Sequence, residues 1–133
     1  MPDLLDELLE AARQASRSAY CPYSNFHVGA AVRAGGRIFT GANVENASYG
    51  LTICAERTAA FASVLAGAGP IEAIAVACVD APEGSGIELL MPCGACRQVL
   101  IEFAAPETPV IVDRVGRMTL ADLLPMAFRL RQV

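Results

Sequence analysis

Clusters of basic residues are missing from this sequence. Lysine and arginine together number 10 among 133 residues, against 14 aspartates and glutamates, so the formal net charge is −4. Proteins that bind nucleic acid usually gather basic side chains on one face, because those side chains neutralise phosphates. The composition therefore argues against a nucleic-acid partner.

Long apolar runs are missing as well. No stretch reaches the roughly 18 continuous apolar residues of a membrane-spanning helix, so we expect no membrane partner. The opening stretch, MPDLLDELLEAARQA, carries four acids and lacks the basic region that begins a secretory signal peptide. An odd count of five cysteines in such a chain favours metal binding or catalysis over disulfides. We expect a reduced, cytoplasmic protein.

Linkers, internal repeats and low-complexity segments are also absent. A chain of this length suits one hydrophobic core, so we expect a single domain over residues 1–133. Hydrophobic residues make up 54% of the chain and charged residues 18%. This apolar excess points to a subunit interface.

Hydrophobic periodicity and turn residues divide the chain into helices and strands. Asp3 is a candidate helix cap, and Gly35-Gly36 marks a tight turn between two strands. In chain order we expect a helix at 3–19, a strand hairpin within 26–44, a helix at 54–66, a strand at 71–79, a helix at 94–103, a strand at 109–113 and a helix at 119–130 that Pro125 interrupts or ends.

This order of elements predicts an α/β fold. A run of strand, helix, strand, helix, strand implies right-handed crossovers and parallel pairing, and the hairpin adds an antiparallel strand. We therefore expect a three-layer α-β-α arrangement, with one mixed sheet of about five strands between helices on both faces.

The run MPCGACRQ, residues 91–98, places two cysteines at a predicted helix start. Such a pair fits thiol-disulfide chemistry, because a helix N-terminus lowers the pKa of a thiol. That interpretation gives no role to Cys54 and Glu56 in the upstream run CAERTA. Cys54 also opens a predicted helix, so two helix N-termini could bring Cys54, Cys93 and Cys96 to one point.

Three thiolates leave one position of a tetrahedral zinc site open. Catalytic zinc keeps such a position for water, whereas structural zinc usually has four protein ligands. The candidates for a fourth ligand are Cys21, Cys78 and His27, and none has ligand-like spacing. A structural zinc site remains an alternative, but it gives Glu56 no role.

Glu56 can share a site with Cys54 only under one geometric condition. Residues two apart in the middle of a helix point to opposite sides. Cys54 must therefore lie at the cap, before helical geometry begins, and the expected boundary puts it there.

Several motifs together resemble cytidine deaminases of the small homotetrameric, zinc-dependent type. The motifs are AYCPYSNFHVGAAV, GANVENASYG, CAERTA, PCGACRQ and LLPMAF, which span about residues 19–128. The CAE and PCGAC runs match the three-cysteine signature of zinc deaminases. The resemblance implies a cytidine deaminase-like fold and the hydrolytic deamination of cytidine and 2′-deoxycytidine in pyrimidine salvage.

The resemblance also assigns the chemistry. Cys54, Cys93 and Cys96 would bind one Zn²⁺ per chain, and Glu56 would be the catalytic proton shuttle. Three thiolates and one divalent zinc sum to a charge of −1. Arg57 would offset this charge by donating hydrogen bonds to the thiolates, as an arginine at this position does in the family.

Substrate contacts follow from the same resemblance. Asn43 and Glu45 would hold the ribose, and backbone groups around Ala55 would read the base edge. The spacing of two puts Asn43 and Glu45 on one face if the strand continues. Turn chemistry would also account for this pair.

The remaining expected contacts are partly shared between subunits of a homotetramer. Phe26 would flank the base within one subunit, and Phe128 would do so from another. Ala47 and Tyr49 would reach a neighbouring subunit's site. Packing alone would also account for Tyr49 and Phe128.

Two related deaminase classes share the zinc chemistry. Polynucleotide deaminases are disfavoured by the acidic charge, and the NVEN run with Tyr49 favours a nucleoside over blasticidin as substrate. Ala42 and Met91 depart from the family pattern, which commonly has a cysteine and a serine there.

Overall fold

The computed structural model describes residues 3–130, which contain every expected helix and strand and, in addition, a short helix at Ile87–Leu90 and a short strand at Gly116–Thr119. The elements are α1 (Leu4–Ala15), the 3₁₀ turn η1 (Ser16–Ser18), β1 (Val28–Ala34), β2 (Arg37–Ala42), the 3₁₀ turn η2 (Tyr49–Leu51), α2 (Ala55–Leu65), β3 (Ile71–Cys78), α3 (Ile87–Leu90), α4 (Gly94–Phe103), β4 (Pro109–Val112), β5 (Gly116–Thr119) and α5 (Leu120–Leu123). Within this described range, every helix is too short or too polar to cross a membrane.

The five strands form one mixed sheet, as expected, and their order in it is β2-β1-β3-β4-β5. β1 runs antiparallel to both β2 and β3, β3 is parallel to β4, and β4 is antiparallel to β5. Parallel pairing across a helical connection therefore occurs only between β3 and β4. β1 is almost entirely buried and lies inside the sheet, whereas the more exposed β2 forms its edge. The connection from β2 to β3 through α2 therefore passes over β1.

The fifth strand, β5, was not among the segments that the sequence delineated. It contains only four residues and follows β4 after a short turn. Its sequence, GRMT, shows no run of β-branched or aromatic residues, so propensity gave no signal for it. Pairing with β4 alone makes it a strand.

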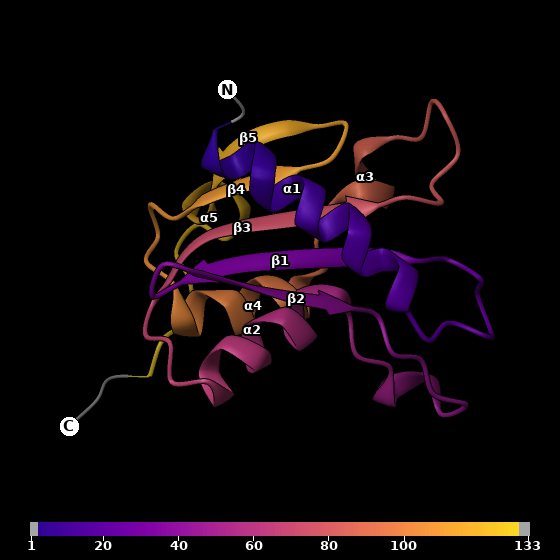
Figure 1. Cartoon of the computed structure of the whole chain (residues 1–133), viewed down its shortest axis with the longest axis horizontal. Helices are drawn as coiled ribbons and strands as arrows, with labels where there is room; N and C mark the ends of the chain where they lie inside the picture. The colour runs from indigo at the N-terminus through magenta and orange to yellow at the C-terminus, as the bar shows by residue number, and fades with distance from the viewer. Residues whose placement is uncertain (1–2, 131–133) are drawn as a thin grey trace.

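Alternate residues of the central strands face two different helical layers. Val32, Ile74, Val76 and Val110 pack in one cluster with residues of α2, α4 and α5. The opposite face is rich in alanine and packs under α1, with its residues Ala31, Ala73, Ala75, Ala77 and Ile111. Figure 1 shows α1 crossing one face of β1 and β3, and α2 and α4 side by side. The three-layer α-β-α arrangement is confirmed.

The first helix forms for the expected reasons but ends earlier. Asp3 is the N-cap, and its carboxylate accepts a hydrogen bond from the amide of Asp6. Leu8, Leu9 and Ala12 are buried along one stripe. The helix ends at Ala15 and continues as η1, so the chain has left α-helical geometry before residue 19.

The last helix is also shorter than expected. Thr119 caps α5 in a capping box with Asp122, and the helix ends at Leu123. Pro125 follows two residues later and prevents continuation, because it has no amide hydrogen to donate. Residues 124–126 then form a bend and a turn, and residues 127–130 have no regular secondary structure.

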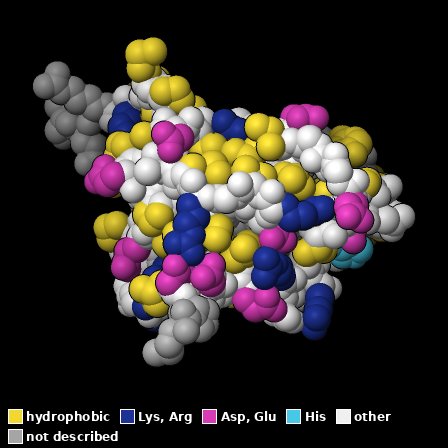
Figure 2. Space-filling model, turned by 90° about the horizontal axis from the view of Figure 1, so that it is seen from above, with side chains coloured by type: hydrophobic (Ala, Val, Ile, Leu, Met, Phe, Trp, Pro, Cys, Tyr) yellow, Lys and Arg dark blue, Asp and Glu magenta, His cyan; other side chains and the backbone are white. Residues whose placement is uncertain are grey.

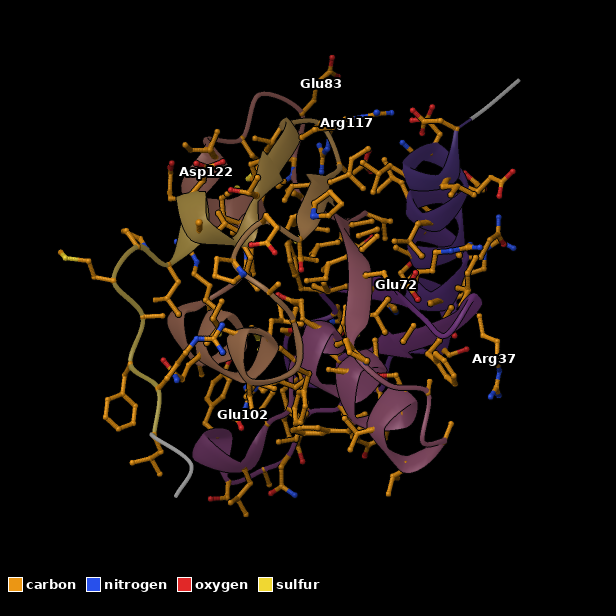
Figure 3. All side chains as sticks on the ribbon, turned by 90° about the vertical axis from the view of Figure 1, so that its left-hand side faces the viewer. Arg37, Glu72, Glu83, Glu102, Arg117 and Asp122 are labelled. Carbon is orange, nitrogen blue, oxygen red and sulfur yellow. The ribbon has the colours of Figure 1, made fainter. Side chains whose placement is uncertain are left out.

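Charged side chains are dispersed over the surface. Figure 2 shows acidic and basic groups interspersed with apolar ones on the face that it displays. In Figure 3 the labelled charged residues come from separate elements, namely Arg37, Glu72, Glu83, Glu102, Arg117 and Asp122. This distribution agrees with the absence of a basic cluster in the sequence.

We predict that Gly29→Ala destabilises the protein by about 1–3 kcal/mol, the usual cost of overpacking a well-packed site. An added Cβ would collide with the carbonyl oxygen of Ala12, which belongs to α1. Urea unfolding at a fixed protein concentration measures the effect. Gly50→Ala is the control, because a Cβ there meets no atom within 4 Å. Equal stability of the two variants would contradict the close approach of α1.

Candidate active site

Two helix N-termini meet beneath the sheet and bring three cysteines together. Cys54 is the N-cap of α2 and has extended backbone angles, with φ −74° and ψ 157°. Cys93 is the N-cap of α4, and Cys96 lies in the first turn of that helix. The Sγ atoms of the three residues all lie within 4.8 Å of one another. The predicted convergence is therefore confirmed.

The spacing of these thiols fits a single tetrahedral metal ion. Zinc–sulfur bonds of about 2.3 Å place two sulfur ligands about 3.8 Å apart at tetrahedral angles. Cys54 Sγ lies 4.0 Å from Cys93 Sγ, and Cys93 Sγ lies 3.4 Å from Cys96 Sγ. All five cysteines of the chain are free thiols. The cluster needs only small side-chain adjustments to coordinate an ion.

The charges around the cluster also suit a divalent cation. Arg57 Nη2 donates a hydrogen bond to Cys54 Sγ at 3.4 Å. Hydrogen bonds from Cys96 and Arg57 lower the pKa of Cys54 to about 5, and the hydrogen bond to Cys54 raises the pKa of Cys96. The cluster alone thus favours one thiolate, and a cation would supply the charge that ionises the others.

The candidate fourth ligands lie outside the cluster. Cys78 donates its thiol hydrogen to the carbonyl of Leu90 at 3.7 Å, and burial raises its pKa to about 11. His27 Nδ1 contacts Asp80 Oδ2 at 2.6 Å. In the described part of the chain, Cys54, Cys93 and Cys96 are the one group that could hold a metal ion. The fourth position is left to a non-protein ligand.

Glu56 satisfies the geometric condition set by its spacing from Cys54. Because Cys54 lies at the cap of α2, Glu56 in the first turn reaches the same cavity. The side chain is almost completely buried. This burial raises the pKa of Glu56 to about 7. The carboxyl group is thus available to hold or release a proton beside the cysteine cluster.

The cavity beside the cluster has a volume of about 190 Å³. Among the expected substrate contacts, Phe26, Asn43 and Ala55 lie on its walls together with Cys54 and Glu56. The cavity wall also includes residues that were not among the expected substrate contacts, namely Val28, Thr52, Cys78, Leu89 and Met91. Val28 and Cys78 lie at the ends of β1 and β3, and Leu89 lies in α3. Thr52 lies between η2 and α2, and Met91 follows α3. Only the tertiary structure brings these separate segments to one cavity.

Asn43 and Glu45 point to the same side, as their spacing predicted. β2 ends at Ala42, but Val44 forms bridges with Tyr20 and Ile53 that keep the backbone extended. Asn43 and Glu45 are therefore buried, whereas Val44 between them is exposed.

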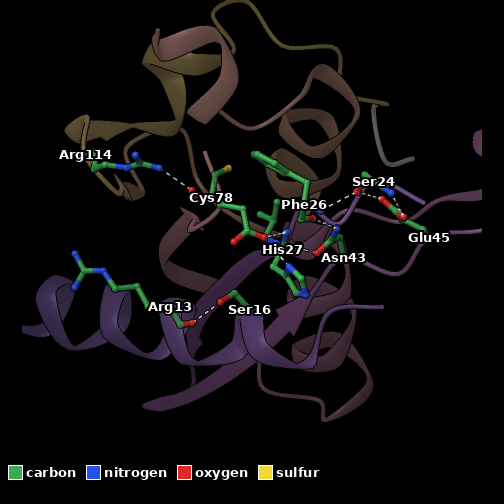
Figure 4. A network of polar contacts seen from close by, with 11 residues as sticks. Arg13, Ser16, Ser24, Phe26, His27, Asn43, Glu45, Cys78 and Arg114 are labelled. Atoms are coloured by element: carbon green, nitrogen blue, oxygen red, sulfur yellow. Dashed lines mark hydrogen bonds and ion pairs between the residues drawn. The ribbon is translucent and has the colours of Figure 1, made fainter. Parts of the chain in front are cut away.

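The side chains of Asn43 and Glu45 both form hydrogen bonds with backbone groups of residues 23–28 (Figure 4). Asn43 Oδ1 accepts from the amide of Val28 at 2.9 Å, and Asn43 Nδ2 donates to the carbonyl of Phe26 at 2.8 Å. The carboxylate of Glu45 accepts hydrogen bonds from the amides of Tyr23 and Ser24 and from the Ser24 hydroxyl. Asn43 keeps one spare N–H donor, and Glu45 keeps one acceptor site.

Four of the expected substrate contacts lie away from this cavity. Glu45, Ala47, Tyr49 and Phe128 are absent from its walls. Tyr49 is 74% exposed and Phe128 is 68% exposed, and Ala47 is exposed as well. One chain alone thus leaves the side chains of Tyr49 and Phe128 mostly exposed.

The geometry defines a class of protein: an α-β-α domain with a three-thiol metal site that keeps one position open beside a buried carboxyl group. The family described as "Cytidine and deoxycytidylate deaminase zinc-binding region" matches residues 3–112. This match covers most of the chain, and the chain belongs to that family. The cofactor is zinc, for which the three cysteines are the candidate ligands.

Known proteins of similar sequence and structure agree with this assignment. The chain is 49% identical to a cytidine deaminase of Mycobacterium tuberculosis over 98% of this chain and 94% of that protein. The crystal structure of cytidine deaminase from Mycobacterium tuberculosis superposes with a TM-score of 0.82 at 45% identity, over 97% of this chain and 100% of the other. The cytidine deaminase from Burkholderia pseudomallei gives 0.81 at 47%, over 92% and 97%. The expected deaminase-like fold is confirmed.

We predict that the purified protein contains one zinc ion per chain and that Cys96→Ala abolishes stoichiometric binding. The cluster would then offer only two thiols, too few to hold zinc with high affinity. Cys78→Ala is the matched control, because Cys78 lines the same cavity but lies outside the cluster. Elemental analysis of both variants measures the outcome. Zinc loss in the Cys78 variant would show that the ligand set is different.

Proposed function

We propose that this protein catalyses the zinc-dependent hydrolytic deamination of cytidine and 2′-deoxycytidine. The products are uridine or 2′-deoxyuridine and ammonia, and the reaction serves pyrimidine salvage. One observation carries the proposal: the buried Glu56 lines one cavity together with Cys54 and Cys93, two members of the three-cysteine cluster. A structural zinc site would leave this carboxyl group without a role.

Cys54, Cys93 and Cys96 hold the zinc ion in this proposal. Bound zinc with an open position acts as a Lewis acid and lowers the pKa of water from 15.7 to about 7. Arg57 donates to Cys54 Sγ and so reduces the excess negative charge of three thiolates.

Glu56 moves the protons. Its carboxylate accepts a proton from the water that attacks C4 of the base, and it delivers that proton to N3. It then takes the proton of the new hydroxyl group at C4 and delivers it to the amino group, so that ammonia leaves and C4 becomes a carbonyl carbon. A positioned acid–base group of this kind is typically worth about 10²–10⁴-fold in rate. Burial raises the pKa of Glu56 to about 7, which suits a group that must both accept and release a proton near neutral pH.

The cavity walls bind the nucleoside. Phe26 flanks the base, and backbone groups around Ala55 read its polar edge. The spare N–H of Asn43, on the cavity wall, and the spare acceptor of Glu45, outside that wall, hold the ribose hydroxyls. Because both side chains are already fixed by bonds to the backbone, they lose little conformational freedom when the sugar binds.

A homotetramer completes the active sites. Tyr49 and Phe128 are large and exposed, as are Leu51, Met126 and Leu130 nearby in sequence. Apolar side chains in such numbers favour burial against another subunit. In the assembly, Ala47 and Tyr49 approach the active site of a neighbouring subunit, and Phe128 flanks the base bound in such a site. Residues 1–133 act as one domain, and the protein works in the cytoplasm.

We predict that Glu56→Gln lowers kcat for cytidine by at least about 10²-fold. Glutamine keeps the size of the side chain but cannot carry the proton. Zinc content and nucleoside binding are expected to persist, since the ligands and Asn43 are untouched. The loss of cytidine absorbance measures turnover, and Glu83→Gln on the exposed loop is the control. A Glu56→Gln variant that binds zinc and turns over at the wild-type rate would falsify the mechanism.

We predict that two defective variants complement each other if active sites are shared. Glu56→Gln chains retain Phe128, and Phe128→Ala chains retain Glu56. After subunit exchange, hybrid tetramers would contain some sites with both residues intact, so the mixture should exceed the mean activity of the two separate proteins. Sedimentation of the wild type should show four chains. An active monomer, or a mixture with only the mean activity, would refute composite sites.

A further inference from the structure

Arg97 joins the metal-binding turn to the segment that follows α5. Its Nε donates to the carbonyl of Pro92 at 2.8 Å, and its Nη1 donates to the carbonyl of Leu123 at 2.8 Å. Pro92 immediately precedes Cys93. Leu123 is the last residue of α5, five positions before Phe128. One planar guanidinium therefore bridges two segments that lie about thirty residues apart in sequence.

Both carbonyls need a side-chain donor. Pro92 lies before the N-cap of α4, so its oxygen takes no part in the helical ladder. α5 ends at Leu123, and Pro125 brings no amide hydrogen to the turn that follows. A buried carbonyl without a donor costs about 1–3 kcal/mol. Arg97 donates to both carbonyls from Nε and Nη1 of one planar guanidinium group, which the single ammonium group of a lysine cannot do in the same geometry.

Neighbouring contacts strengthen the connection to the C-terminal segment. Gln98 Nε2 donates to the carbonyl of Phe128 at 3.0 Å, and Arg129 Nη2 donates to the carbonyl of Ala104 at 3.4 Å. α4 and its C-cap residue thus contact the end of α5 and the segment that follows it at three points. Arg97 is the one among these contacts that also reaches the metal-binding turn.

We propose that Arg97 is a positioning residue that couples the zinc site of one subunit to the C-terminal segment that carries Phe128. This inference rests on the proposed function, in which Phe128 flanks the base in a neighbouring site. The guanidinium fixes the Pro92 carbonyl and so the backbone that aims Cys93 Sγ at the metal. The same group fixes the end of α5, from which the segment departs. Order at the metal-binding turn is thereby transmitted to the next subunit's binding site.

The zinc-release rate tests the first half of the coupling. Groups that orient metal ligands typically contribute 10–100-fold to metal affinity. We expect Arg97→Ala and Arg97→Lys to release zinc to an excess of the chelator 4-(2-pyridylazo)resorcinol at least about 10-fold faster than the wild type. Lysine keeps the positive charge but lacks the planar guanidinium group. Zinc release at the wild-type rate in Arg97→Lys would therefore overturn the role of the guanidinium group.

Arg13→Ala is the control for general destabilisation. Arg13 donates three side-chain hydrogen bonds, two to Asp113 and one to Glu10, and it lies on α1 across the sheet. Its loss should leave zinc release at the wild-type rate. If Arg97→Ala releases zinc no faster than Arg13→Ala, the proposal is wrong, whatever the two melting temperatures are.

Hydrogen exchange tests the second half. In Arg97→Ala the amides of residues 119–128 should exchange faster than in the wild type. In Gln98→Ala only the amides near residue 128 should do so, with unchanged zinc release. Unchanged exchange of residues 119–128 in Arg97→Ala would overturn the coupling. A wild-type protein that holds zinc but does not deaminate cytidine would contradict the proposed function alone, and the chelator and exchange results would still decide the role of Arg97.

Discussion

The meeting of two helix N-termini is the constraint on which the site depends. Each helix start leaves backbone amides without partners and carries a partial positive charge, which stabilises an anionic sulfur placed there. Cys54 and Cys93 occupy the two caps. α2 and α4 must therefore lie side by side with their starts in register, and the order of the strands secures this. β3 is central and parallel to β4, so the chain that leaves β3 returns through α4 on the face already occupied by α2.

Local chemistry made much of this site predictable. Helix caps depend on a few adjacent residues, so the positions of Cys54, Cys93 and Glu56 followed from the predicted helix starts. The common face of Asn43 and Glu45 followed from strand periodicity. The roles of Asn43 in bonding Val28 and Phe26 did not follow, because these contacts depend on how the loop before β1 folds back.

Long-range packing decided the remainder. The place of β1 between β2 and β3 reflects its burial on both faces, which a hairpin pattern does not reveal. β5 exists only through its pairing with β4. The cavity walls at Cys78 and Leu89 come from the end of β3 and from α3, elements without a shared sequence signal. The bridge made by Arg97 was equally hidden, since its acceptors are backbone carbonyls that any residue supplies.

The alanines beneath α1 give the two faces of the sheet opposite tolerances to mutation. Replacing an alanine with any residue other than glycine adds side-chain atoms. Ala31, Ala75 and Ala77 are fully or almost fully buried against the helix, so there is no room for added atoms. On the other face, a valine or isoleucine can be replaced with a smaller residue. The replacement leaves a cavity, and the loss of folding stability grows with the cavity volume. We therefore expect few substitutions at the positions beneath α1. Around α2 and α4 we expect pairs of substitutions in which one side chain becomes smaller and its neighbour becomes larger. Homologues should therefore share the separation between α1 and the sheet more closely than the detailed packing around the active site.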